Sequence, residues 1–225
     1  MARKKVTKKR QSKKTKKSKT TVRKKRAPKN TKNPNHPKKG SSIKVEPIRS
    51  RAAIKRIRKL LADNPRNLAL FALGINMAFR ANEIVALNVK DVKHLKPGKV
   101  LDHKQRKTQQ YRQVVMNRSA YEAIQSWLKV RPKSASPALF PSNRSERLTV
   151  PAVHKLVKTW CKHVGLKGNY GSHTLRKTWG FMQRDAGVSE ILISEAYGHS
   201  SVKQTRSYLG IQSKEVIDLY SKLEL

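Results

Sequence analysis

Four residues near the C-terminal end of this 225-residue sequence have the types and spacing needed for chemistry on a phosphodiester. Eight residues separate His199 from Tyr208, and Arg176 lies 23 residues before His199, at the end of the tetrad His173-Thr174-Leu175-Arg176. A guanidinium can bind two phosphate oxygens at once, and an activated tyrosine hydroxyl can act as a nucleophile. The group therefore indicates a site that binds a phosphodiester and attacks it with a tyrosine.

Cleavage of a phosphodiester requires more than a nucleophile. The charge that builds on the non-bridging oxygens must be neutralised, and the departing alkoxide must receive a proton. Arginine suits the first task because its planar fork matches a phosphate, and lysine or histidine suits the second. Residues of both types precede the tetrad, at Arg80 and in the basic run Lys104–Lys107.

The segments around these residues resemble motifs of the tyrosine recombinases, the phage integrase family. Ala78–Leu87, followed by Asp91, looks like the first arginine motif of that family. Lys107-Thr108, with Arg112 and Val114 on the next predicted strand, is similar to the lysine that the family carries on a β-hairpin. Both motifs lie upstream of the histidine–arginine tetrad, in the order that the family has.

The two remaining motifs lie in the last third of the chain. His173–Thr178 resembles the HxxR box of the family, and Tyr197-Gly198-His199, Thr205 and Tyr208 resemble the box that ends in the nucleophile. The resemblance covers about residues 50–220. Four motifs in the expected order make it specific, whereas one alone would be weak.

The resemblance implies roles for the nucleophile and for the residues that bind phosphate. Tyr208 would attack the scissile phosphate, leaving a 3′-phosphotyrosyl bond and a free 5′-hydroxyl. Arg80 and Arg176 would hold the non-bridging oxygens, and Glu83 would support Arg80 from behind. Because the covalent intermediate conserves the energy of the broken bond, no ATP, metal or other cofactor is implied.

The resemblance also implies roles in proton transfer. Lys107 would protonate the departing 5′-oxygen, and His173 would handle the proton of the tyrosine. His199 would hydrogen-bond the phosphate and orient the site. The choice of lysine stays open, because Lys104 and Arg106 lie close to Lys107 in the sequence. Lys99 is a poorer candidate, since it lies in the turn before the hairpin.

Each of these residues also has a purely structural interpretation. Tyr208 could be a half-buried aromatic residue of a helix, and the two arginines could be surface cations of a very basic chain. Against that interpretation, each arginine lies within an apolar stretch, where an unpaired charge is costly. The two histidines could be core residues or could begin helices.

Neither a disulfide nor a metal site is predicted. Cys161 is the single cysteine, which rules out an intrachain disulfide and indicates a reducing compartment. The remaining histidines show no ligand spacing with it: His36, His94, His103, His154 and His163.

No apolar run approaches the roughly 20 residues that span a bilayer, and no apolar stretch follows the basic N-terminus. We therefore expect a cytoplasmic, nucleoid-associated protein.

Hydrophobic periodicity and turn residues predict a mainly α domain with one small antiparallel β-sheet, an α+β fold. Ser50 is expected to cap the first helix, whose apolar face holds Ile54, Ile57, Leu60 and Leu61. Asn64-Pro65 should end it, and a buried second helix should run from Leu68 to Phe79. Further elements are listed in chain order: a short helix capped by Asn82, strands at His94-Leu95, Val100–His103 and Tyr111–Met116, and helices at 119–130, 150–164, 173–186, 189–197, 201–208 and 213–222.

Charge divides the chain into two parts. The formal net charge is +40, and residues 1–44 carry 20 of the 53 lysines and arginines but no acid. With almost no apolar residues, this part cannot offset the entropy of folding, so residues 1–44 are predicted to be a disordered DNA-binding tail. Residues 45–225 are predicted to be the catalytic domain. Such a charge indicates a polyanionic partner, and phosphate contacts of this kind carry no sequence information.

The resemblance further implies double-stranded DNA as the partner, with a homodimer on each site and a homotetramer in the synaptic complex. Full-length members usually carry a core-binding domain before the catalytic domain. Here we expect a short form in which the basic tail takes over the affinity of that domain. The apolar stripe of Val216, Leu219, Tyr220 and Leu223 could pack in cis or onto a neighbouring protomer.

The functional prediction is a site-specific DNA recombinase that acts in integration, excision or inversion. One alternative is a non-catalytic DNA-binding regulator or architectural protein that retains the recombinase fold. A basic nucleoid or ribosomal protein would explain the tail but not the motifs. Type IB topoisomerases share the chemistry, but at the positions of their Ser-Lys-x-x-Tyr signature this chain has Gln204 and Thr205.

Overall fold

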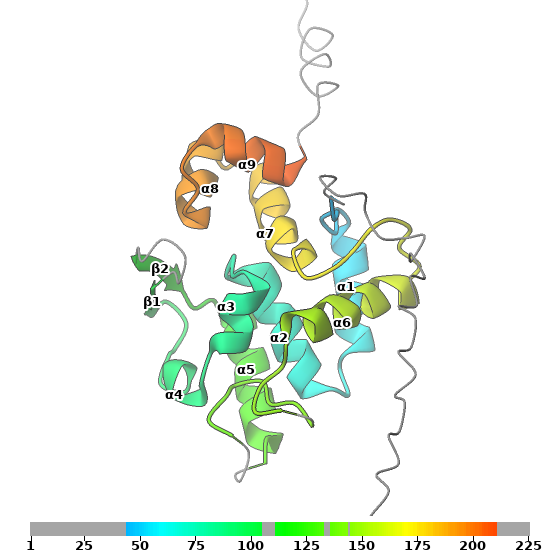
Figure 1. The fold of residues 1–225 in the computed structure, drawn as a ribbon, viewed down its shortest axis with the longest axis vertical. Helices are drawn as coiled ribbons and strands as arrows, with labels where there is room; N and C mark the ends of the chain where they lie inside the picture. Colours follow the sequence, from blue (N-terminus) through cyan, green and yellow to red (C-terminus); the bar gives the residue numbers. More distant parts are fainter. Residues whose placement is uncertain (1–43, 105–110, 133–135, 144, 211–225) are drawn as a thin grey trace, which may run out of the picture. The chain divides into compact units, whose positions relative to one another are not determined.

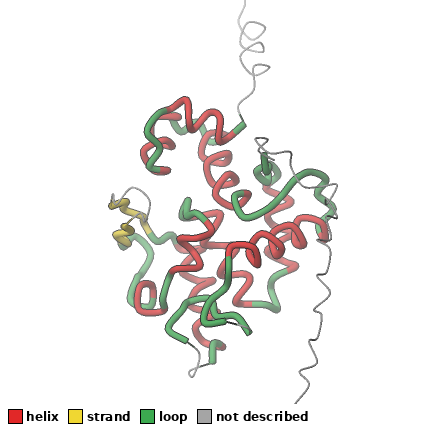
Figure 2. The backbone as a smooth tube through the Cα atoms, in the orientation of Figure 1, coloured by secondary structure: helices red, strands yellow, loops and turns green. Residues whose placement is uncertain are grey.

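A computed structural model describes residues 44–104, 111–132, 136–143 and 145–210 of the chain. The described residues are mainly helical and include one two-stranded antiparallel sheet, which confirms the predicted fold class (Figures 1 and 2). None of the helices formed by these residues is long and apolar enough to cross a bilayer. In chain order the elements are α1 (Arg51–Leu60), α2 (Pro65–Asn76), α3 (Ala81–Ala86), α4 (Val89–Val92), β1 (Val100–Lys104), β2 (Tyr111–Val115), α5 (Arg118–Val130), α6 (Val150–His163), α7 (Thr174–Asp185), α8 (Glu190–Tyr197) and α9 (Val202–Leu209).

Side-chain caps explain where the first helix begins and ends. The Ser50 hydroxyl accepts the N–H of Ala53, as the sequence predicts, and satisfies one of the donors that a helix N-terminus leaves open. The buried stripe of α1 runs through Ile57 to the C-cap Leu61. Leu60, which was expected on the same face, is exposed, because the buried face passes from Ile57 directly to Leu61.

The second helix ends three residues earlier than the apolar pattern predicts. α2 stops at Asn76, and Ala78 adopts a left-handed backbone with φ of 51°. Phe79 is nevertheless buried, because the chain turns back onto the same core after the helix has ended. Apolar spacing alone cannot distinguish these two ways of reaching a core, which is why the predicted helix was too long.

The predicted start of the third helix was also wrong. Arg80, not Asn82, is the N-cap of α3, and its backbone N–H donates to Oε2 of Glu83 at 2.7 Å. The Glu83 carboxylate thus caps the helix from within its first turn, where it also lies near the positive end of the helix dipole. This cap places the Arg80 side chain at the mouth of the site described below.

The sheet is a single hairpin in which Val100 pairs with Val115 and Leu101 with Val114. His94-Leu95 was expected to form a strand, but it follows the short helix α4 as a turn, in which the Leu95 N–H donates to the carbonyl of Val92. The helix forms because the Asn88 N–H donates to the Asp91 carboxylate at 2.8 Å, a local cap that outweighs the short apolar pattern.

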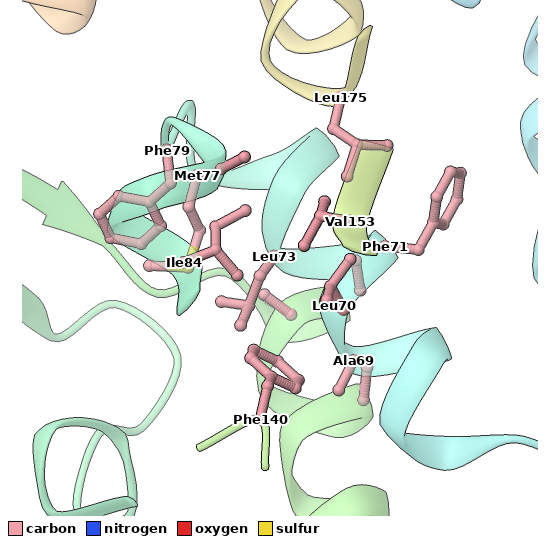
Figure 3. Close-up of a cluster of buried hydrophobic side chains, with 14 of the residues drawn as sticks. Ala69, Leu70, Phe71, Leu73, Met77, Phe79, Ile84, Phe140, Val153 and Leu175 are labelled. Carbon is pink, nitrogen blue, oxygen red and sulfur yellow. The ribbon is translucent and has the colours of Figure 1, made fainter. Parts of the chain in front are cut away.

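Helix α2 lies at the centre of the main core and packs against α5 on one side and α7 on the other. Figure 3 shows Leu175 of α7 reaching toward Val153 and the residues of α2. A second, smaller cluster joins Ala78 to Ile193, Tyr197 and Leu209. Helix α7 therefore touches both cores, and residues on its two sides are fixed by different neighbours (Figure 1).

We predict that Gly74→Ala destabilises the domain, although alanine is intrinsically about 1 kcal/mol better than glycine within a helix. A methyl group at position 74 would lie 2.7 Å from Cβ of Leu175 and closer still to its Cδ1. Overpacking of this kind typically costs about 1–3 kcal/mol of the free energy of unfolding, which urea denaturation would measure. In a Leu175→Ala background the same substitution should cost less, because the nearest atom is gone. An equal cost in both backgrounds would contradict this account of the α2–α7 contact.

Candidate active site

Five of the six predicted site residues lie within the described part of the chain, and the structure brings them together around Tyr208. They are Arg80 at the N-cap of α3, His173 at the N-cap of α7, Arg176 in α7, His199 between α8 and α9, and Tyr208 in α9. Lys107, the predicted helix 213–222 and residues 1–43 of the predicted tail lie outside the described residues. Segments almost 130 residues apart in the sequence thus supply one site.

The guanidinium of Arg176 occupies the centre of this site. Its residue is only 2% exposed, and its two terminal nitrogens donate to backbone carbonyls, Nη1 to Ala78 at 2.5 Å and Nη2 to Tyr197 at 2.6 Å. The guanidinium carbon also lies 4.4 Å from the centre of the Tyr197 ring. These contacts fix the plane of the arginine fork before any ligand arrives.

Glu83 connects the two arginines. Its carboxylate is buried, and Oε1 accepts from Nη1 of Arg80 at 2.8 Å while Oε2 lies 3.9 Å from Nη1 of Arg176. The Arg80 side chain is 29% exposed, so it is paired and yet reachable from solvent. One buried anion between two cations offsets part of their mutual repulsion and holds them side by side, which an incoming phosphate requires.

The Tyr208 hydroxyl lies 3.4 Å from Nδ1 of His173. The Tyr208 ring meets the rings of Tyr197 and His199 nearly edge to face, at 5.3 and 5.4 Å between centroids. Burial raises the pKa of Tyr208 to about 12, and the charges of Arg176 and Arg80 oppose that rise. Near neutral pH the Tyr208 hydroxyl is therefore protonated.

The two histidines are kept neutral near pH 7. Burial, and then the charges of Arg176 and Arg80, lower the pKa of His199 to about 4. The His173 side chain is exposed at the surface, yet partial desolvation and then Arg176 lower its pKa as well. A neutral imidazole can accept a proton, and Nδ1 of His173 lies 3.4 Å from the Tyr208 hydroxyl.

His199 is oriented through its other partner. Its Nδ1 lies 2.8 Å from the hydroxyl of Thr205, which is fully buried in α9. If Nδ1 accepts the hydroxyl proton, Nε2 carries the ring proton and can donate it to an oxygen in the site. Thr205, part of the motif that includes Tyr208, thus fixes the orientation of the His199 ring.

Three features of the site were not anticipated from the sequence. The Ala78 carbonyl and the Tyr197 carbonyl bind Arg176, and backbone groups leave no signal in residue types. Lys177 is the third: it is only 6% exposed, and its Nζ lies 5.1 Å from the centre of the Tyr208 ring. Its position directly after Arg176 was visible, but nothing distinguished it from the other lysines of so basic a chain.

Comparison with known proteins identifies the family of this chain. The model of the phage integrase family matches residues 50–215. Over 162 residues the chain is 32% identical to the tyrosine recombinase XerC of Caldanaerobacter subterraneus subsp. tengcongensis, a match that covers 70% of this chain and 44% of that one. It is 32% identical over 174 residues to the probable integrase/recombinase YoeC of Bacillus subtilis, covering 74% of this chain and 90% of that protein.

A solved structure shows the same fold. The crystal structure of the XerH site-specific recombinase bound to palindromic difH substrate, a post-cleavage complex, superposes with a TM-score of 0.64 at 22% identity, covering 81% of this chain and 54% of that one. The fold is thus that of a tyrosine recombinase catalytic domain. The chain belongs to the phage integrase family. It spans less than half the length of the XerC protein that it matches.

We predict that His199 makes the domain less stable in weak acid. A histidine whose pKa falls from 6.5 in the unfolded chain to about 4 in the folded one opposes folding once the unfolded chain takes up the proton. Between pH 7 and pH 5 this one group should remove about 2 kcal/mol from the free energy of unfolding. Urea denaturation at the two pH values would measure the loss.

His199→Asn is the matched control, since an amide oxygen can accept from Thr205 but does not titrate in this range. The variant should lose about 2 kcal/mol less than the natural protein between pH 7 and pH 5. The other titrating groups are common to both proteins and cancel in the comparison. Equal losses would contradict a neutral, buried His199.

Proposed function

We propose that residues 45–225 form the catalytic domain of a site-specific DNA recombinase, which cleaves and rejoins DNA through a 3′-phosphotyrosyl intermediate in integration, excision or inversion. The observation that carries the proposal is the assembly around Tyr208. A tyrosine hydroxyl lies within reach of a neutral histidine, beside two arginines that a buried carboxylate holds together. DNA binding alone needs no such arrangement.

In the proposed reaction Oη of Tyr208 forms a bond to the scissile phosphorus as the bond between phosphorus and the 5′-oxygen breaks. The tyrosine proton passes to His173, whose Nδ1 is 3.4 Å away. The 5′-oxygen takes a proton from Lys107 and leaves as a hydroxyl. Attack by a 5′-hydroxyl of another strand reverses these steps and restores Tyr208, so the energy of the bond is conserved.

The two arginines and His199 would stabilise the charge that develops on the phosphate. Arg80 and Arg176 would each donate to a non-bridging oxygen, and His199 would donate from Nε2. Such preorganised donors in a partly desolvated site typically contribute several kcal/mol to lowering the barrier. The backbone bonds of Arg176 make its contribution preorganised, because the guanidinium need not move to receive the phosphate.

Double-stranded DNA is the proposed substrate and partner. A net charge of +40 favours a polyanion, and XerH, which has the same fold, was crystallised on its difH substrate. We infer that the protein acts as a homodimer on each site and a homotetramer in the synaptic complex. Association with the nucleoid follows from the same charge.

Residues 1–44 are proposed to act as a DNA-binding tail that raises affinity without reading sequence. They carry 20 positive charges and no acid, and cations of this kind bind phosphates by releasing counterions. Sequence selection would then rest on residues 45–225. This division of labour is testable because the segment Lys44–Ile48 is anchored to the domain separately, through Asn169 and Thr178.

A covalent-trapping assay tests the nucleophile. Nicked duplexes from DNA flanking the gene, cut so that a short 5′-hydroxyl fragment diffuses away, should leave an SDS-stable, protease-sensitive adduct. Tyr208→Phe should abolish the adduct, since a ring without a hydroxyl cannot attack phosphorus. Tyr121→Phe, which removes a hydroxyl from α5 outside the site, should form adduct as the natural protein does. Tight binding of the same DNA with no adduct from the natural protein would favour the alternative of a non-catalytic regulator.

Salt dependence tests the tail. Deleting residues 1–43 leaves the anchored segment in place and should weaken DNA binding at physiological salt. The slope of log K against log [salt] should fall in magnitude by about 0.9 for each phosphate that the tail neutralises. A neutral Gly/Ser-rich segment of equal length in place of the tail should behave like the deletion. Unchanged affinity would show that the tail contributes nothing to binding.

A further inference from the structure

Lys177 is a buried lysine in direct contact with the nucleophile. It follows Arg176 in α7, its residue is 6% exposed, and its Nζ lies 5.1 Å from the centre of the Tyr208 ring. A lysine is almost never so buried unless it is paired. Within the described part of the chain, no carboxylate oxygen lies within ion-pair distance of Nζ, so the tyrosine ring is the partner that the structure shows.

The position of Lys177 is itself firmly fixed. Its backbone N–H donates to the carbonyl of His173, and its neighbour Thr178 accepts the N–H of Ile48 while donating to the carbonyl of Thr174. The segment that carries Ile48 also brings Lys44 and Glu46 within electrostatic range of Nζ. The backbone of Lys177 therefore belongs to a helix turn whose neighbours are hydrogen-bonded to α7 and to the segment of Ile48.

The remaining neighbours of Tyr208 leave the orientation of its ring only partly determined. Tyr197 and His199 make nearly perpendicular contacts, His173 reaches the hydroxyl at 3.4 Å, and Arg176 makes a side-chain hydrogen bond to Tyr208. The aromatic edges restrict where the ring lies, and the charges of Arg176 and Arg80 favour the phenolate from a distance. A cation at the ring adds to both effects, because it is attracted to the π-system and more strongly to a phenolate.

We propose that Lys177 is a positioning residue for the nucleophile: its ammonium holds the Tyr208 ring in the orientation needed for attack and favours the phenolate that forms during attack. The inference rests on the proposed function, because it gives Tyr208 the role of nucleophile. It assigns to Lys177 no contact with DNA and no proton transfer. The positive charge at the ring, not the volume of the side chain, is what acts.

The other charged groups around Lys177 and Tyr208 are the same in all the variants that test the proposal. Arg176, Arg80 and Glu83 act on Tyr208, and the two histidines of the site adjoin it. Lys44 and Glu46 act on Lys177, and burial lowers its pKa together with the charge of Lys44.

Lys177→Met removes the cation while keeping an apolar chain of similar length, and Lys177→Arg keeps the cation. Lys59→Met makes the same change of net charge at an exposed position of α1.

The first experiment compares binding with cleavage on the nicked duplexes described above, at saturating protein in a single turnover. Lys177→Met should bind DNA as Lys59→Met does but form the Tyr208 adduct about 10–100-fold more slowly. Lys177→Arg should recover most of the rate. Loss of affinity matching the loss of rate would instead make Lys177 a phosphate contact and overturn the proposal. An unchanged rate in Lys177→Met would overturn it as well.

The second experiment uses neither DNA nor activity, so it separates this inference from the proposed function. A polyfluorinated tyrosine, acidic enough to titrate near neutrality, is placed at position 208 and followed by fluorine NMR in the full chain. The midpoint of its ionisation should rise by about one pH unit in Lys177→Met and stay within a few tenths in Lys177→Arg. Equal midpoints in all variants, with each variant shown to be folded by its urea transition, would overturn the proposal even if the adduct forms.

Discussion

The burial of one charged group, the Arg176 guanidinium, constrains the rest of the site. An unpaired charge in a protein interior costs several kcal/mol, so the structure must bring hydrogen-bond acceptors to it. It does so with the carbonyls of Ala78 and Tyr197 and with the carboxylate of Glu83. The turn after α2, the end of α8 and the start of α3 are thus all fixed by one side chain. The left-handed backbone at Ala78, unusual for a residue with a Cβ, lies at one of the two positions whose carbonyl reaches the arginine.

Tyr197 extends this constraint to Tyr208. Its carbonyl binds Arg176, its ring lies against the guanidinium, and its hydroxyl donates back to the Arg176 carbonyl at 2.8 Å. The ring fits only because Gly180 has no side chain: a Cβ there would lie 2.7 Å from Cζ of the tyrosine and closer to its hydroxyl. The other side of Tyr197 packs on His199 and Tyr208. Tyr197 therefore contacts both Arg176 and Tyr208 and links their positions.

The parts of the fold that the sequence predicts are those that local interactions decide. Ser50 marks the start of α1, and Gly198, which directly follows the predicted helix 189–197, is the C-cap of α8 in a left-handed conformation, so both ends could be predicted from neighbouring residues. The spacing of the histidines, Arg176 and Tyr208 likewise indicated that they share a site. The end of α2 could not be predicted, because the turn at Ala78 serves a residue 98 positions away. Lys177 was hidden for another reason: in a chain with 53 lysines and arginines, residue type does not mark a lysine that is buried against Tyr208.

The charges of the site also set how it would respond to its ligand. Burial, and then the charges of Arg176 and Arg80, lower the pKa values of His173 and His199, and the two arginines oppose the rise that burial causes in the pKa of Tyr208. A phosphodiester between the two arginines would bring a negative charge that offsets part of their field. The pKa of His173 would then rise toward its ordinary value and make the imidazole a stronger base, at the moment when a phosphorus atom is in place for attack. Binding and proton abstraction would be coupled through electrostatics, since the carbonyls of Ala78 and Tyr197 already hold Arg176 before a phosphate binds.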